Sequence, residues 1–311
     1  MSIALTDTLH FGLQARLDSR DDIRATVRRA EDAGLESLWV GEHIVFTGPI
    51  HDPLLRLAQA AAYSERLSFG TAVYLLPLRP PAAVAKQVIT LDHLTGGRLV
   101  FGAGVGGEFP KEFEVCGVPH GERGARLGEG IEVLRALWSG ESVSHAGRFW
   151  SFTDVRLDPP PLQPGGPPIW LGGRQPAALR RIGRKADGWM SYVVTPEQYA
   201  AGLEVIGEAA DRAGRRLDRF ATAHLLFVRI DDSRERALAD ATAMLSHRYG
   251  MDFSRPAARY PALGPPAAIA ERILAFRSAG VRHFILDFIA TPEEEAAQIA
   301  RFAEAVRPLL G

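Results

Sequence analysis

The sequence predicts an α/β fold, a (β/α)8 TIM barrel, in a single domain over residues 1–311. Short apolar runs alternate eight times with amphipathic helical segments, the pattern of strands that are each followed by a helix. A chain of 311 residues suits such a barrel, which takes about 250 residues before insertions. Apolar residues make up 46% of the chain, enough for a large core. Because an open doubly wound sheet has the same alternation, that fold stays an alternative.

The expected strands are the short apolar runs. They cover residues 11–13, 37–40, 67–75, 98–101, 168–171, 188–190, 221–230 and 283–287. The expected helices follow these strands in turn, over residues 21–33, 53–66, 82–94, 122–138, 177–185, 196–213, 234–247 and 292–306. Gly34 ends the first helix in the usual way. Thr195 and Thr291 each precede a proline and, three positions on, a glutamine or glutamate, which predicts two capped helix starts.

Two segments interrupt the alternation. Residues 142–167 combine a hairpin-like pattern around Gly147 with a proline-rich run at residues 158–166. Residues 250–266 are also proline-rich and irregular. Because each segment leads into another element of the same pattern, we interpret both as insertions and expect them to cover the C-terminal mouth of the barrel.

Composition excludes several classes of protein. The net charge of −1 provides no field that favours nucleic acid or an anionic membrane. A single cysteine, Cys116, excludes an internal disulfide framework and a cysteine-rich zinc site. Residues 1–7 lack the basic start of a signal peptide, and no window of about 18 uncharged apolar residues is present. We therefore expect a soluble cytoplasmic protein.

A glycine run after the fourth expected strand is the most informative motif. Gly102, Gly104 and Gly107 match the GxGxxG fingerprint of dinucleotide-binding Rossmann folds. Here, however, Glu108-Phe109-Pro110 follows in place of a helix, and no strand with a terminal acid lies about 20 residues on. We therefore interpret the run as bare backbone at a strand end, against which a flat ligand can lie.

Two other strand ends carry chemical groups, and in a barrel the C-terminal strand ends form the active site. Residues 37–40 lead into Glu42 and His43, a carboxylate beside an imidazole. Residues 168–171 lead into Gly172-Gly173-Arg174 before a helix, a pattern that binds anions. Ordinary loop residues and a tight turn are the alternatives at these two places. Two glycine-rich strand ends in one barrel favour a planar cofactor that carries a phosphate.

With these motifs, the chain resembles the bacterial luciferase-like superfamily of flavin- and deazaflavin-dependent oxidoreductases, and most of all its coenzyme F420-dependent branch. The resemblance covers nearly the whole chain and rests on the order of several segments. These are residues 36–43, 67–73, 85–99, 102–107, 117–124, 168–174 and 186–189.

The resemblance implies a cofactor site across the barrel mouth. It implies a non-proline cis peptide between Ala72 and Val73 behind the cofactor ring, and His43 as a catalytic residue. Glu108 is a second candidate catalytic residue, although it lies one position later than in sugar-phosphate-oxidising relatives, which argues against such a substrate. The cofactor-binding residues implied are Glu42, Ala72, Val73, Val105, Gly106, Gly107, Leu171, Gly172, Gly173 and Arg174.

The expected activity is hydride transfer between coenzyme F420 and a small organic substrate, with His43 as proton donor or acceptor. The alternatives are a monooxygenase that uses FMN and O2, supplied by a partner reductase, and a non-catalytic flavin-binding protein. The family implies a homodimer and a flavin or F420 reductase as partner. No metal site is expected, because His-x-His and His-Glu-x-x-His motifs are lacking. Tyr74, Arg79 and His224 are weaker candidates for substrate contact.

Overall fold

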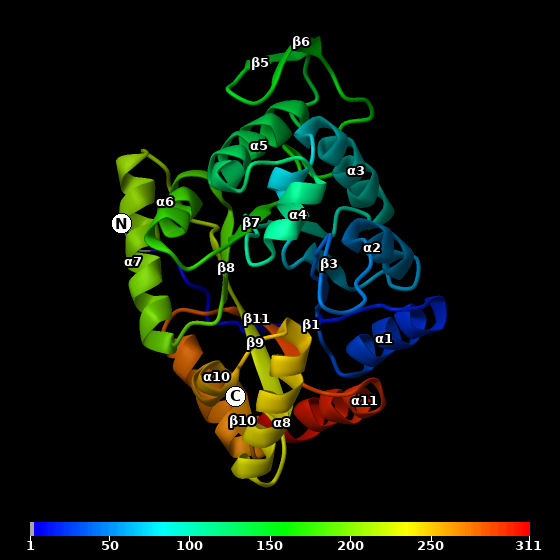
Figure 1. The fold of residues 1–311 in the computed structure, drawn as a ribbon, viewed down its shortest axis with the longest axis vertical. Helices are drawn as coiled ribbons and strands as arrows, with labels where there is room; N and C mark the ends of the chain where they lie inside the picture. The colour runs from blue at the N-terminus through cyan, green and yellow to red at the C-terminus, as the bar shows by residue number, and fades with distance from the viewer. Residues whose placement is uncertain (1–2) are drawn as a thin grey trace.

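The computed structural model describes residues 3–311, and within them eight parallel strands form a closed barrel (Figure 1). Each strand pairs with the next in the order that follows, and β11 pairs with β1 to complete the circle. The strands are β1 (His10–Gln14), β2 (Ser37–Val40), β3 (Ser68–Thr71), β4 (Leu99–Ala103), β7 (Ile169–Gly172), β8 (Gly188–Tyr192), β9 (Ala221–Ile230) and β11 (His283–Phe288). Closure confirms the predicted TIM barrel and excludes the open sheet.

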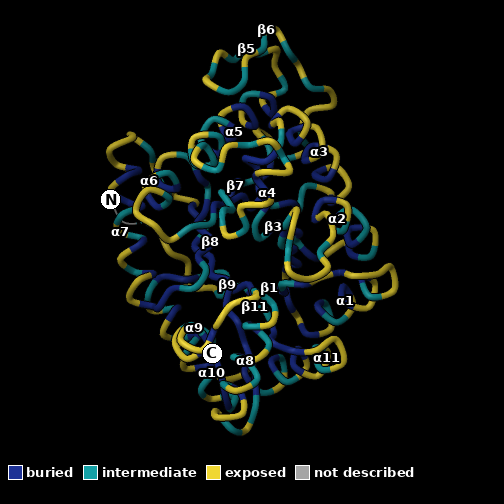
Figure 2. The backbone as a smooth tube through the Cα atoms, in the orientation of Figure 1, coloured by how far each residue is buried: buried dark blue, intermediate teal, exposed yellow. Residues whose placement is uncertain are grey.

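Helices surround the strands, and their buried faces form the outer core (Figure 2). They are α1 (Arg20–Asp32), α2 (Pro53–Ala61), α3 (Pro81–Leu94), α5 (Arg123–Leu137), α6 (Pro176–Lys185), α7 (Pro196–Arg212), α10 (Pro266–Ser278) and α11 (Pro292–Arg301). Both predicted capping boxes are present, at Thr195 and Thr291. The last helix runs on through turns at Phe302–Val306 and Arg307–Leu310.

The helix that follows β9 differs from the expectation. The helix expected over residues 234–247 forms as α8 (Arg234–Tyr249), but it packs against α9 (Ser254–Arg259) and β10 (Ala262–Gly264). β10 pairs with the end of β9, so these three elements form one insertion beyond that strand. The seventh position of the outer layer belongs to α10, which packs against α7 and β9. No helix was expected at these residues.

The expectation that residues 142–167 cover the mouth is wrong. They form a hairpin of β5 (Val143–Ala146) and β6 (Ser151–Val155) that projects away from the barrel next to α5 (Figure 1). Glu129 of α5 holds the hairpin turn there by accepting the backbone N–H groups of residues 148–150. Gln163 hydrogen-bonds to Asp92 of α3, which fastens the following loop to the outside. Residues 250–266 do not line the mouth cavity either; α8 does.

Two stacked tryptophans fill the interior of the barrel. Trp39 and Trp170 have ring centroids 5.1 Å apart. Gly12 and Gly70 make room for Trp39, since a Cβ would lie 2.7 Å from its Nε1 at Gly12 and 2.2 Å from its Cζ3 at Gly70. Its indole N–H donates to Ser37 at 2.8 Å. Because this part of the interior is packed, the open space lies at the C-terminal ends of the strands.

Glycine at position 102 is required by the close approach of β3 and β4. A Cβ there would lie 1.8 Å from the carbonyl oxygen of Thr71, which is backbone and cannot move aside. We expect Gly102→Ala to lower the free energy of unfolding by about 1–3 kcal/mol or more, because the site becomes overpacked. Gly128→Ala is the control, since a Cβ at this helical position meets nothing within 4 Å and alanine favours a helix. Equal thermal midpoints for the two variants would contradict this account.

Candidate active site

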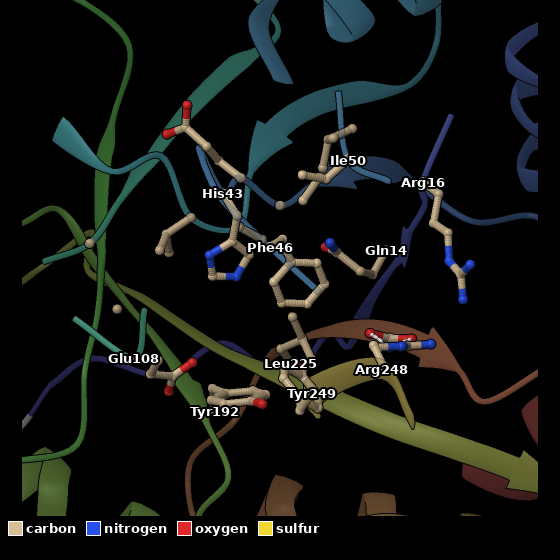
Figure 3. A pocket seen from close by; sticks show the side chains of 18 of the residues that line it. Gln14, Arg16, His43, Phe46, Ile50, Glu108, Tyr192, Leu225, Arg248 and Tyr249 are labelled. Atoms are coloured by element: carbon tan, nitrogen blue, oxygen red, sulfur yellow. Dashed lines mark hydrogen bonds and ion pairs between the residues drawn. The ribbon is translucent and has the colours of Figure 1, made fainter. Parts of the chain in front are cut away.

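A cavity of about 510 Å³ lies at the C-terminal ends of the barrel strands (Figure 3). Its walls are the ends of the strands, the loop after β2 and the last turns of α8. The volume is within the range of about 300–1,000 Å³ that small-molecule sites occupy. The cavity therefore lies at the strand ends where the sequence predicted the chemical groups.

Ten of the twelve site residues expected from the sequence line this cavity. They are Glu42, His43, Ala72, Val73, Val105, Gly106, Glu108, Gly172, Gly173 and Arg174. Leu171 does not, because alternation along β7 turns its side chain outward into the core beneath the helices. Gly107 does not either. Its φ of +113° turns the chain away, and a Cβ there would meet Arg123 and His120 instead.

The floor of the cavity is formed by Val73, which follows β3. The peptide bond between Ala72 and Val73 is cis, as the resemblance implied. The Val73 side chain lies between two strand ends, because a Cβ at Gly104 would be 2.4 Å from its Cγ2 and one at Gly172 would be 3.2 Å from its Cγ1. The glycines thus make room for Val73, and together they form an apolar surface that fits one face of a flat ring.

One end of this floor is suited to a phosphate. Gly173 has a φ of +132°, and Arg174 is exposed beside it at the start of α6. The N-cap residue Gln175 forms no side-chain hydrogen bond to the first turn, so the N–H groups there remain available. Within residues 3–311, Arg174 has no acidic partner. Helix N–H groups beside a free guanidinium are the donors that bind phosphate.

Glu42 holds the segment that carries the floor. Its buried carboxylate accepts the backbone N–H of Leu75 at 2.6 Å and forms an ion pair with Arg79. Burial raises the pKa of Glu42, and the positive charge of Arg79 opposes that rise. The resemblance gave Glu42 a contact with the cofactor ring, but its hydrogen bonds are directed into the wall, where they fix residues 73–79.

His43 is held in place by a carboxylate that the sequence did not reveal. Its Nδ1 lies 3.1 Å from Oε1 of Glu112, a fully buried residue of α4 (Pro110–Val115). The same oxygen accepts the backbone N–H of Ile44 at 2.7 Å. With Nδ1 donating to Glu112, Nε2 is the nitrogen that remains to exchange a proton with a ligand. No local pattern marks Glu112, because it is 69 residues away in the chain.

Two tyrosines and Glu108 form the side of the cavity opposite to His43 (Figure 3). Tyr192 ends β8, Tyr249 ends α8, and both side chains line the cavity. Burial raises the pKa of Tyr249 to about 12 and holds that of Tyr192 well above its usual value, so both hydroxyl groups are neutral. Glu108 is exposed at the rim, and in Figure 3 its carboxylate points toward Tyr192.

The three weaker candidates from the sequence do not line the cavity. Tyr74 is buried in the wall, and Arg79 is committed to Glu42. His224 is a core residue that lies 2.6 Å from the hydroxyl of Ser191 and stacks on Phe276. Burial lowers the pKa of His224 to about 3, so it stays neutral.

In residues 3–311 there is neither a metal-binding group of three or more His, Cys, Asp or Glu residues nor a helix long and apolar enough to span a membrane.

Comparison with known proteins identifies the family. The model of the luciferase-like monooxygenase family matches residues 1–307. The chain therefore belongs to this family of oxidoreductases and monooxygenases, whose members use a flavin or deazaflavin cofactor. The fold, the cavity at the strand ends and the cis peptide that the resemblance implied all agree with this assignment.

The relatives include a monooxygenase and an F420-dependent dehydrogenase. The chain is 33% identical over 216 residues to 4-hydroxyprotoasukamycin monooxygenase of Streptomyces nodosus subsp. asukaensis, a match over 67% of this chain and 58% of that protein. It is 27% identical over 314 residues to F420-dependent glucose-6-phosphate dehydrogenase of Nakamurella multipartita, over 90% of each. The chain spans 57–58% of the length of the first curated relatives that it matches.

A solved structure confirms the fold over the whole chain. The structure of an F420-dependent secondary alcohol dehydrogenase in complex with an F420–acetone adduct superposes with a TM-score of 0.85 at 20% identity. The match covers 98% of this chain and 99% of that one. The similarity shows that the two proteins share the barrel.

The ion pair at Glu42 predicts a pH-dependent defect. Arg79→Leu leaves the buried carboxylate without its counter-charge, so we expect a loss of about 3–5 kcal/mol of stability at pH 7. The pKa of Glu42 then rises further in the folded state, which binds more protons than the unfolded state. Stability of the variant therefore falls as pH rises above the unfolded value of about 4.5.

Urea unfolding between pH 5 and pH 8 measures this effect. Glu42→Gln/Arg79→Leu is the control, because it removes the buried charge and should recover most of the stability at pH 8. If the urea midpoint of Arg79→Leu did not depend on pH, this account of the ion pair would be contradicted.

Proposed function

We propose that the protein transfers a hydride between coenzyme F420 and a small organic carbonyl or alcohol substrate. The observation that carries this proposal is the His43–Glu112 pair, which presents an imidazole nitrogen to the cavity beside the Val73 floor. Reduction of a carbonyl, or oxidation of an alcohol, requires a proton transfer at oxygen together with each hydride transfer, and a histidine suits this task at neutral pH.

The residues of the cavity fit such a cofactor. The apolar floor of Val73 between Gly104 and Gly172 would support one face of the ring system, and Gly173 with Arg174 would bind the phosphate. F420, when bound, supplies a two-electron hydride carrier that does not readily activate O2. Gly104 follows β4 and Gly172 ends β7, so the two glycines are far apart in the chain. They lie close together in the barrel because β4 pairs with β7.

The protein's own contribution is orientation and proton transfer. Nε2 of His43 would donate a proton to the substrate oxygen in reduction and accept it in oxidation. Glu112 fixes the orientation of the ring through Nδ1 and stabilises the imidazolium that forms when His43 takes up a proton. Phe46 stacks on His43 at 4.4 Å between ring centroids and limits its rotation.

A monooxygenase that uses reduced FMN and O2 is the second candidate. Its support is the 33% identity to a monooxygenase. The same floor and phosphate-binding end would accept FMN, so the cofactor must be distinguished by experiment. A homodimer, a partner reductase and a cytoplasmic location stay predictions.

Direct titration distinguishes the two cofactors. We expect F420 to bind the purified protein with micromolar or tighter affinity, measured by quenching of cofactor fluorescence, and FMN to bind at least about tenfold more weakly. Arg174→Ala should weaken binding of either cofactor, because a guanidinium–phosphate hydrogen bond contributes about 1.5–3 kcal/mol. The exposed residue Arg216, which is paired with Asp218, provides the matched control Arg216→Ala. Micromolar binding of FMN without binding of F420 would overturn the choice of cofactor.

Two variants test the proton-transfer pair. His43→Ala should lower kcat by about 10²–10⁴-fold and leave the affinity for F420 nearly unchanged. In alcohol oxidation, where His43 accepts the proton, Glu112→Gln should lower kcat less, with little change in KM, and shift the acidic limb of the kcat pH profile to lower pH, because the imidazolium loses a neighbouring negative charge. An unchanged kcat for His43→Ala would exclude the proposed role, and an unchanged pH profile for Glu112→Gln would exclude the coupling.

A further inference from the structure

A second set of hydrogen-bond donors lies in the cavity, opposite the end suited to a phosphate. We call this set the donor group and define it as Gln14, Arg16 and Arg248, all of which line the cavity. Gln14 ends β1, Arg16 follows that strand, and Arg248 lies in the last turn of α8. In the closed barrel of eight strands, β1 lies opposite β7, which leads into Arg174. A phosphate bound at Arg174 therefore leaves the donor group free for another ligand.

Strand register brings two members of the donor group together. Leu13 of β1 pairs with Leu286 of β11 in parallel. The next residues of the two strands, Gln14 and Asp287, therefore lie side by side, and both line the cavity. Asp287 accepts hydrogen bonds from Nη1 of Arg248 at 2.9 and 3.0 Å. The Gln14 side chain and the Arg248 guanidinium are thus held at the same pair of strand ends.

Each member of the donor group has N–H groups to spare. Asp287 occupies only Nη1 of Arg248, so Nη2 and Nε have no partner within residues 3–311, and neither is sealed from solvent. The same holds for Nε2 of Gln14, whose Oε1 is buried in the wall. Arg16 is exposed and forms no hydrogen bond or ion pair with the described part of the chain. Figure 3 shows Arg16 and Arg248 on one side of the cavity and Glu108 on the other.

The charges around the donor group favour a ligand group with one negative charge. Two ion pairs are neutral as units, Arg248 with Asp287 at 2.9 Å and Arg29 with Glu295 at 3.6 Å. Arg16 then adds one uncompensated positive charge inside the cavity, while Asp18 is exposed at its rim, where solvent screens its charge. Guanidinium groups donate only, and their planar N–H groups match the two oxygens of a carboxylate. A phosphate with two charges would exceed the positive charge that is available.

We propose that the substrate carries a carboxylate that binds to the donor group, so that it is an oxo acid or the corresponding hydroxy acid. The assignment of the carbonyl or alcohol to the His43 end of the molecule rests on the proposed function. The geometry allows both contacts, because His43 follows β2 and β2 pairs with β1. Ile50 and Leu225 offer apolar surface to the carbon frame. The carboxylate takes no part in the reaction and fixes the position of the substrate.

Calorimetry with three rigid probe compounds tests the proposal on the full chain, with and without saturating F420. The probes are 4-acetylbenzoate, its neutral isostere 4-acetylbenzamide, and 4-acetylphenylphosphonate, which carries two charges at pH 8. The benzoate should bind about 10–100-fold more tightly than the benzamide, the effect of charge-assisted hydrogen bonds, and at least as tightly as the phosphonate. The preference for the benzoate should decrease as the salt concentration rises.

Variants of the donor group provide the decisive comparison. Arg16→Gln breaks no contact within the described chain and should reduce the preference for the benzoate to about threefold or less. Its matched control is Arg28→Gln, at an exposed and unpaired arginine of α1 outside the cavity. Arg248→Lys keeps a positive charge beside Asp287 but loses the spare guanidinium donors, so it should weaken binding of the benzoate several-fold. Arg174→Ala, at the phosphate end, should leave that binding unchanged.

Three results would overturn the proposal. They are equal binding of the benzoate and the benzamide, a preference for the benzoate that persists in Arg16→Gln, and a phosphonate that binds more tightly than the benzoate. Displacement of the benzoate by F420, or its loss in Arg174→Ala, would place it at the phosphate end and would also overturn the proposal. If the probes behave as expected but neither F420 nor FMN binds, the proposed function fails while the carboxylate site stands.

Discussion

The cavity floor depends on the close approach of the ends of β3 and β4. The Thr71 hydroxyl donates to the carbonyl oxygen of Gly102 at 2.7 Å, and the same oxygen accepts the N–H of Tyr74 at 2.8 Å. The N–H of Gly104 in turn donates to the carbonyl oxygen of Tyr74 at 2.9 Å. These contacts leave no room for a side chain at Gly102, and they fix Val73 between its two neighbouring strand ends. The shape of the site is therefore set by backbone contacts more than by side chains.

The two polar residues that follow β2, Glu42 and His43, point in different directions. Glu42 is turned into the wall, where it fixes the segment after β3, and His43 is turned toward the cavity. Each depends on a partner from another part of the chain, Arg79 for the first and Glu112 for the second. The position of the cavity floor and the orientation of His43 thus depend on adjacent residues, but each of these residues is held by a different partner.

The parts of the structure that local patterns encode were predictable. The barrel, the capping boxes at Thr195 and Thr291 and the position of the cavity all follow from periodicity, turn chemistry and strand ends. Glu112 and Tyr249 were missed, because their roles arise from contacts between segments far apart in the chain. The helix α10 was missed because a single helix was expected between the last two barrel strands, whereas three helices, α8, α9 and α10, lie between β9 and β11.

The segment between β9 and α10 leaves the barrel and returns to it at neighbouring positions. β10 lies beside the last residues of β9, and the N–H of Asp231 donates to the carbonyl oxygen of Gly264 at 3.0 Å. The α8 side of the cavity, which includes Met244 and Tyr249, therefore belongs to an insertion in the barrel. One hydrogen bond joins the start of this insertion to its end. Such a module can be lengthened, shortened or exchanged between barrels without disturbing strand closure, so this side of the cavity can change while its floor stays constant.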